Sequence, residues 1–391
     1  MIIEILTIGV IILAILIALT WLAIELQYRN RPGNALELTC GYWNLAVEEP
    51  EKYLLVGEME LCNRTKSLEI MVPEVQAEVK LLSSGSLEGV TCRTQIVPFH
   101  KDALARQDNY WFAYIVKIGK KTKFKVSIDI QGNNLEQLNS AWIKVNYVTY
   151  GPGGRIPKVQ NIIVPLKFPD PSSTPNQREV TNAKVFPIRT HLLTQLDDPI
   201  EIIKRYVVPH AQKGDIVTIG ETPLALIQGR FRHPTDIKPG WVAKRICYFF
   251  MPTSSLATAC GMQTLVDIVG PIRVLIAFFG GSIAKILGQP GMFYQFAGQQ
   301  ARLIDDVTGT LPPYDQFIVL GPENTQQVVE QIQQATGLGA AIVDVNDLKA
   351  VKILAATSNV SHYLLEEALR SNPAGNADEQ TPLVLIRPSS S

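Results

Sequence analysis

The chain has 391 residues, and its 36 Lys and Arg side chains balance 36 Asp and Glu side chains, so its formal net charge is zero. This balance excludes a broad basic surface, so no nucleic-acid partner is expected. Hydrophobic residues make up 46% of the chain and its mean hydropathy is +0.11, which excludes a disordered protein. The length predicts two or three domains.

An uncharged segment lies near the N-terminus, from Ile5 to Ile24. As a helix it is long enough to cross a bilayer. A cleavable signal peptide has a basic start and a shorter apolar region, whereas here only Glu4 precedes the segment. We therefore expect an uncleaved transmembrane anchor over residues 1–30. Arg29 and Arg31 follow the uncharged segment, which predicts a single-pass membrane protein with the bulk of the chain in the cytoplasm.

The cysteines give no metal motif. Their spacings are wide, and none forms a CxxC or Cys/His pair, so a zinc site is not expected. In the cytoplasm they are expected to be reduced thiols. A disulfide bridge between Cys62 and Cys92 is the alternative if the chain faces the other side of the membrane. The five cysteines are Cys40, Cys62, Cys92, Cys247 and Cys260.

Residues 36–168 are predicted to form an antiparallel β-sandwich, immunoglobulin-like in outline. Short segments rich in β-branched and aromatic residues alternate with turn signals, and no strong helix pattern interrupts them. This pattern predicts six or seven strands. The clearest candidates are Tyr53–Cys62, Val75–Leu82, Tyr110–Ile118, Lys123–Ile130, Ala141–Tyr150 and Gln160–Leu166.

The predicted sandwich shows no catalytic group of residues. His100 lies close to Pro98 and is expected at the surface or in a turn. Trp111, Trp142 and Tyr147 are expected in the core. The domain is therefore expected to act as a spacer or to bind a protein partner, which the sequence does not identify.

The pattern changes after a linker rich in Pro, Ser and Asn at residues 169–184. Residues 185–391 mix helix and strand signals, which makes the whole chain α+β. Asp198 and Pro199 predict a helix start. The other predicted elements are the strands Asp215–Ile219, Ala340–Val343 and Thr381–Pro388 and the helix Gln326–Ala335.

A second apolar stretch runs from Met251 to Leu287. It holds only three charged residues, Asp267, Arg273 and Lys285, and the last two interrupt any membrane span. A buried pair of core helices is the preferred interpretation. A helix seated on a membrane surface is the alternative.

Several segments in the second half resemble one known family. Gly214–Arg230 (GDIVTIGETPLALIQGR) and Gly337–Leu348 (GLGAAIVDVNDL) look like strand-containing motifs of the coenzyme F-420-0:L-glutamate (γ-glutamyl) ligase family. Pro187–Lys204 also resembles it, and Ala301–Asp306 does so more loosely. The resemblance extends from Val185 onward and implies a ligase-like α/β domain. Similar anchored chains are found among cyanobacterial members of this group.

The resemblance implies a reaction class, an acid–amino-acid ligation. Such a ligase activates a small-molecule carboxylate with a nucleoside triphosphate, ATP or GTP, and the amine of glutamate then forms an amide. Mg²⁺ or Mn²⁺ would neutralise phosphate charge. The resemblance assigns the metal to Asp305, Asp344 and Asn346. Independently, Asp344 follows an apolar strand, and ligands gather at strand carboxyl ends in α/β sheets.

The chain departs from the family in two of these motifs: Asp347 stands where the family has a Gly after the Asn, and a four-residue sequence is replaced. Where the family has Ser-Lys-Ala-Glu, this chain has Ala225-Leu226-Ile227-Gln228. Gly229 and Arg230 are retained and are the candidate cofactor-binding residues, since an arginine can meet phosphate. A solvated strand end is an equal interpretation. Two hypotheses follow: a membrane-tethered γ-glutamyl ligase-like enzyme, or a catalytically inactive membrane-anchored binding or scaffold protein that reuses the ligase fold.

Overall fold

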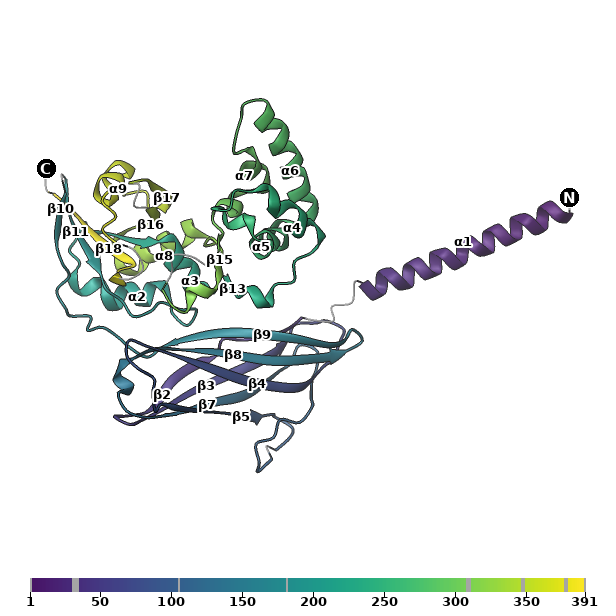
Figure 1. Ribbon diagram of the computed structural model, residues 1–391, viewed down its shortest axis with the longest axis horizontal. Coiled ribbons are helices and arrows are strands. Elements are labelled where there is room, and N and C mark those ends of the chain that lie inside the picture. Colours follow the sequence, from purple (N-terminus) through teal and green to yellow (C-terminus); the bar gives the residue numbers. More distant parts are fainter. Residues whose placement is uncertain are drawn as a thin grey trace.

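The computed structural model describes residues 2–29, 35–104, 106–180, 182–306, 311–345, 349–375 and 379–389. The chain begins with one helix, α1 (Ile2–Arg29), which projects away from the rest of the molecule (Figure 1). Within it, Thr7–Gln27 is long and apolar enough to cross a membrane, and none of it is buried against other parts of the chain. The predicted apolar helix is confirmed, and its insertion in a membrane stays a prediction.

A β-sandwich follows α1, and all of its strand pairs are antiparallel. One sheet has the order β1-β3-β7-β5, with β2 also paired to β3, and the other has the order β6-β4-β8-β9. Side chains of both sheets meet in one apolar core, as the sequence predicted. The strands are β1 (Leu36–Leu38), β2 (Tyr42–Glu49), β3 (Lys52–Asn63), β4 (Ile70–Ser83), β5 (Thr91–Phe99), β6 (Tyr114–Val116), β7 (Lys121–Gln131), β8 (Leu138–Gly151) and β9 (Gly154–Pro165).

The strands predicted from the sequence are those in which apolar and polar side chains alternate. In β7 every second side chain from Phe124 to Ile130 is buried, which is the pattern of a strand with one face on a core. β5 was missed because its first residues are exposed and polar, so no apolar alternation marks them. The predicted strand Tyr110–Ile118 is reduced to the three residues of β6. All five cysteines are free, so no Cys62–Cys92 bridge forms.

The prediction for His100 was wrong. Its ring is buried, stacks on Tyr114 with 3.8 Å between ring centroids, and Nδ1 lies 2.8 Å from Oγ1 of Thr122. Burial lowers the pKa of His100 to about 4, so the ring is neutral at physiological pH. Trp111 and Tyr147 lie in the sandwich core as expected.

The second half of the chain is built on a six-stranded sheet with the order β10-β11-β18-β12-β16-β17. β12 and β16 are parallel, and the other pairs are antiparallel. The hairpin β10–β11 takes in the last residues of the predicted linker. The strands are β10 (Arg178–Val180), β11 (Ala183–Ile188), β12 (Ile216–Gly220), β16 (Gly339–Val345), β17 (Val351–Ala356) and β18 (Leu383–Pro388).

Helices cover both faces of this sheet. α2 (Pro199–Tyr206), α3 (Glu221–Ile227) and α8 (Thr325–Thr336) share one core with the sheet, and α9 (His362–Leu369) shares another on the opposite face. As predicted, Asp198 caps α2, because its side chain accepts hydrogen bonds from the first backbone N–H groups of the helix.

The Gly-Asp pair of the first family-like motif has a structural use. The buried carboxylate of Asp215, which directly precedes β12, accepts hydrogen bonds from Nε and Nη2 of Arg387 on β18 at 3.0 and 2.7 Å. A charge-assisted pair of this kind fixes two neighbouring strands against each other.

A helical lobe, residues 237–304, is inserted between the strands of a small sheet with the order β13-β15-β14. α5 is largely buried, which fits the predicted core helix, but α6 buries only Val274 and Ala277 completely. The expectation of two buried helices was therefore wrong for α6. The elements are α4 (Trp241–Ile246), α5 (Ala259–Val269), α6 (Pro271–Ile286), α7 (Met292–Ala297), β13 (Phe231–Arg232), β14 (Asp305–Asp306) and β15 (Ile318–Val319).

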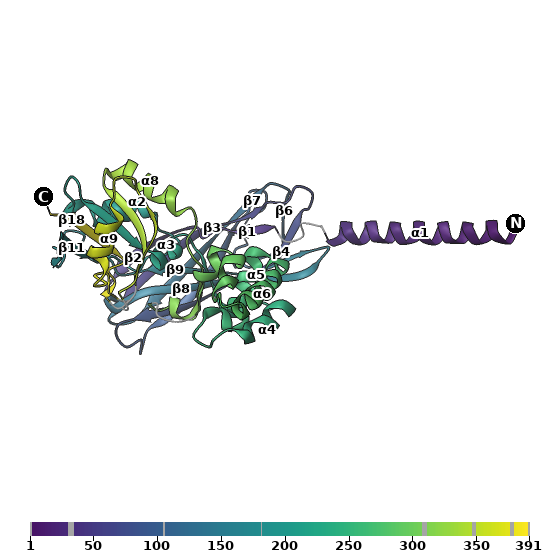
Figure 2. The ribbon, with the colours of Figure 1, turned by 90° about the horizontal axis from the view of Figure 1, so that it is seen from above.

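The sandwich and the second half of the chain are joined by an interface core. Trp142 of β8 and Ile163 of β9 point out of the sandwich and pack with Leu226 of α3 and with Phe317. Figures 1 and 2 both show β8 and β9 on the side of the sandwich that meets the second half. Trp142 is buried as predicted, but in this interface core, because its neighbours in β8 take the inward positions.

Replacing the indole of Trp142 should weaken this interface. Trp142 is 9% exposed, so Trp142→Ala is expected to lower the free energy of unfolding by about 3 kcal/mol, through lost burial and the cavity left behind. Scanning calorimetry of the full chain in detergent measures the change. Tyr42→Ala, at a sandwich side chain that is 73% exposed, is the control and should change little. Equal changes in the free energy of unfolding for the two variants would show that the interface contributes nothing to stability.

Candidate functional site

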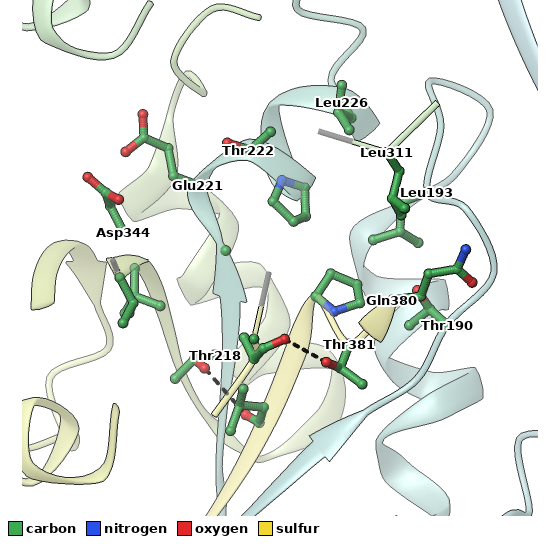
Figure 3. A pocket seen from close by; sticks show the side chains of 18 of the residues that line it. Thr190, Leu193, Thr218, Glu221, Thr222, Leu226, Leu311, Asp344, Gln380 and Thr381 are labelled. Carbon is green, nitrogen blue, oxygen red and sulfur yellow. Dashed lines mark hydrogen bonds between the residues drawn. The ribbon is translucent and has the colours of Figure 1, made fainter. Parts of the chain in front are cut away.

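A cavity of about 290 Å³ opens where the parallel strands β12 and β16 end. Ligand sites in α/β sheets form at such carboxyl ends, because the chain leaves the sheet there and its loops enclose a space. Figure 3 shows the cavity between the end of β12, the start of α3 and the loop before β18. Its lining includes Glu221, Asp305 and Asp344.

Three carboxylates converge on this cavity. Glu221 is the first residue of α3, directly after β12, and Asp344 lies near the end of β16. Their side chains lie next to each other in Figure 3. Asp305 comes from β14, which pairs with β15. Segments more than 120 residues apart in the chain thus supply one acidic cluster.

The surroundings of the cluster disfavour the ionised form of its carboxylates. Burial, and then the carboxylates of Asp344 and Asp305, raise the pKa of Glu221 to about 7, although Lys352 opposes the shift. The pKa of Asp305 is also raised, by burial and by Asp344. Nζ of Lys352 is 3.9 Å from Oδ2 of Asp344, and both side chains are about half exposed, so solvent weakens this pair. The cluster favours a proton or a bound cation.

The structure brings together two of the three predicted metal ligands. Asp305 and Asp344 line the same cavity, whereas Asn346 lies outside the described residues. Sequence reasoning missed Glu221. The signal was available, because Glu221 follows the buried strand β12 as Asp344 follows the apolar part of β16.

The donor set suits a hard cation, because all three groups offer carboxylate oxygens. Within the described residues, no three His, Cys, Asp or Glu side chains are arranged so that they hold a metal ion by themselves. Mg²⁺ sites that act on phosphates usually use one or two carboxylates, with waters and phosphate oxygens as the other ligands. Asp305 and Asp344 fit that kind of open site.

Gly229 and Arg230, the predicted cofactor residues, lie outside the lining of the cavity. The guanidinium of Arg230 pairs with the Glu323 carboxylate and donates to the carbonyl of Gly321 at 2.5 Å and to Oε1 of Gln300 at 3.3 Å. Arg230 thereby ties α3 to the helical lobe. A role for these two residues in cofactor binding stays a prediction.

Residues 225–228 have packing roles in this structure. Ala225, Leu226 and Ile227 form the last turn of α3 and are buried. Leu226 both lines the cavity and packs in the interface core. Gln228 exchanges two 2.8 Å hydrogen bonds with the backbone of Glu323.

A buried polar chain lies on the opposite wall of the cavity. His191, which lines the cavity and is only 3% exposed, has Nε2 3.0 Å from Oδ1 of Asp197 and Nδ1 2.8 Å from the hydroxyl of Tyr206. Both ring nitrogens are therefore engaged, and the ring is fixed in place. The sequence gave no reason to single out His191, because Asp197 and Tyr206 are adjacent only in the folded chain.

One family model matches the sandwich. Residues 37–168 match the family model described as the N-terminal Ig-like domain of F420-0:gamma-glutamyl ligase. No curated protein matches the chain. Residues 185–391, with the acidic cluster, lie outside the matched range.

Two solved structures are similar to part of the chain. The GAE domain of yeast GGA1 is 14% identical, with a TM-score of 0.20, and the match covers 35% of this chain and 96% of that one. A protein from Archaeoglobus fulgidus is 10% identical, with a TM-score of 0.19 and coverage of 34% and 98%.

Removing the charge of Glu221 should stabilise the protein at alkaline pH. The folded-state pKa of about 7 lies above the ordinary value of 4.5, so the folded protein loses stability as pH rises through this interval. Glu221→Gln should therefore be about 1–2 kcal/mol more stable than the wild type at pH 8 without divalent cations, and equally stable near pH 4.5.

Thermal unfolding of the full chain at both pH values, with a chelator present, measures this difference. Glu366→Gln, an exposed carboxylate on α9 outside the cavity lining, is the matched control and should show no pH-dependent difference. A pH-independent effect of Glu221→Gln would contradict the proposed charge repulsion.

Proposed function

We propose that this protein is a membrane-tethered ligase that joins the carboxylate of a small molecule to the amine of glutamate, using ATP or GTP and Mg²⁺ or Mn²⁺. The observation that carries the proposal is the convergence of Glu221, Asp305 and Asp344 on one cavity at the ends of β12 and β16. The match of residues 37–168 to the Ig-like domain of a γ-glutamyl ligase, and the family-like motifs after Val185, support this choice.

Asp305 and Asp344 are the residues that would hold the cation, as the family resemblance implies. A bound divalent cation would supply positive charge beside the nucleotide phosphates. This charge is needed here, because Lys352 is the cation that acts on Glu221 and Asp305, and it is half exposed. Without added positive charge, an acidic cavity would repel a triphosphate.

Glu221 is suited to accept a proton. The amine of glutamate is protonated at neutral pH and must lose a proton before it attacks an activated carboxylate. A carboxylate with a pKa of about 7 is a better base than an ordinary one and is still ionised in part at neutral pH. We assign Glu221 the role of proton acceptor, and Asp305 and Asp344 the role of cation ligands.

The apolar part of the cavity protects an activated intermediate. Leu193, Leu226 and Tyr314 line the cavity, and Figure 3 shows the two leucines across it from Glu221 and Asp344. An acyl phosphate is hydrolysed by water, so a wall that excludes water favours attack by the amine. The helix α1 would hold this site at a membrane, with the cytoplasmic side as the source of nucleotide and glutamate, as in anchored chains of cyanobacterial type.

Nucleotide binding tests the proposal. In titration calorimetry of the full chain in detergent, ATP or GTP should bind in the presence of Mg²⁺ or Mn²⁺. Asp305→Asn and Asp344→Asn should each weaken binding about tenfold or more, because each removes a charged cation ligand. Glu366→Gln should bind like the wild type.

Glu221→Gln separates binding from chemistry. If Glu221 is the proton acceptor, this variant should keep nucleotide affinity and lose ligation of labelled glutamate to a carboxylate acceptor. Absence of nucleotide binding in the wild type, or full binding by both Asp variants, would refute the ligase proposal. It would favour the alternative, an inactive membrane-anchored scaffold.

A further inference from the structure

The outer face of α6 is an apolar stripe that nothing in the described structure covers. Its five side chains are spaced alternately by four and three residues, which places them on one side of a helix. Each is between 60% and 86% exposed. They are Ile272, Ile276, Phe279, Ile283 and Ile286.

The stripe continues onto neighbouring parts of the helical lobe. The ring of Phe249 lies 4.9 Å from that of Phe278 on α6, and Phe249 is itself exposed. Tyr248 and Met251 beside it are exposed, as is Leu287 at the end of α6. α4, which presents Trp241 to solvent, packs on α6. Soluble monomers rarely expose apolar patches of this size without a partner.

The charge of the lobe identifies the kind of partner. Residues 237–304 contain six basic residues and one acidic residue, which gives a net charge of +5 in a chain that is neutral overall. The acidic residue, Asp267, already pairs with Arg232, with 2.6 Å between Nη1 and Oδ2. The basic residues are Lys238, Lys244, Arg245, Arg273, Lys285 and Arg302. An apolar face within a positive lobe matches an anionic lipid surface and would repel a second copy of itself.

The position of the lobe agrees with this partner. Both views show the helical lobe toward the end of the molecule from which α1 leaves, while the C-terminus lies at the opposite end (Figures 1 and 2). Five residues, 30–34, separate the end of α1 from residue 35, and the six steps between residues 29 and 35 reach at most roughly 22 Å. A bilayer that holds α1 would therefore lie close to the sandwich end beside the lobe.

We propose that the outer face of α6 docks on the surface of the membrane that holds α1, with Trp241 and Tyr248 at the lipid–water boundary. Together, α5 and α6 are long and apolar enough to span a membrane. However, the chain bends by 111° between them, and α5 is largely buried in the lobe. The lobe therefore lies on the bilayer and does not cross it. This inference does not depend on the ligase proposal.

Tryptophan quenching by lipid tests this docking. The full chain is reconstituted in vesicles whose acyl chains carry bromine, which quenches tryptophans that enter the bilayer. Phe279→Trp adds a probe to the α6 face, and Tyr363→Trp adds one on α9 with nearly equal exposure, 66% against 62%. After subtraction of the wild-type signal, the probe at position 279 should be quenched about twofold more than the control, and more so in anionic than in neutral vesicles.

Two outcomes would overturn the proposal. Equal quenching of the two probes would show that α6 stays in water. Shielding of the probe at position 279 from bromine, growing with the protein-to-lipid ratio and accompanied by crosslinked dimers, would show that a second copy covers the face. Circular dichroism of both variants confirms that they are folded. The measurement needs no nucleotide or metal, so its outcome is separate from that of the ligase test.

Discussion

The packing of α3 against the outer face of the sandwich is the contact on which the arrangement of the site depends. α3 is only seven residues long, so its first and last turns adjoin. Leu226 in its last turn is held by Trp142 and Ile163, and Glu221 at its start faces the cavity. Apolar burial that joins the two halves of the chain thereby also fixes the position of a carboxylate. Ala225, Leu226 and Ile227 in this helix are accordingly apolar and buried.

The repulsion among the carboxylates of the acidic cluster lowers the stability of the folded protein. Clusters of this kind are typical of functional sites. Three carboxylates line one cavity, and burial together with the charges of Asp344 and Asp305 raises the pKa of Glu221 to about 7. By contrast, Asp215 is fully paired by Arg387 and serves the sheet. The two acidic sites differ in their partners, and this difference separates a candidate reactive site from a structural one.

The apolar helices of the chain differ in how far the rest of the structure covers them. None of Thr7–Gln27 in α1 is buried, α5 is covered by the helical lobe, and α6 is covered on one side only. Burying every apolar stretch of this composition would need a larger lobe than 68 residues provide. One membrane would cover both surfaces if α1 spans it and α6 docks on it, as proposed above.

Local patterns in the sequence determined much of this protein: the apolar length of α1, the alternating strands such as β7 and the Asp198 cap of α2. Each depends on neighbours within a few residues. Only the tertiary structure decided that His100 is buried, that Trp142 faces outward, that one side of α6 is bare, and that Glu221, Asp305 and Asp344 share a cavity. Burial and charge proximity are set by segments far apart in the chain, and one sequence does not record which of them meet.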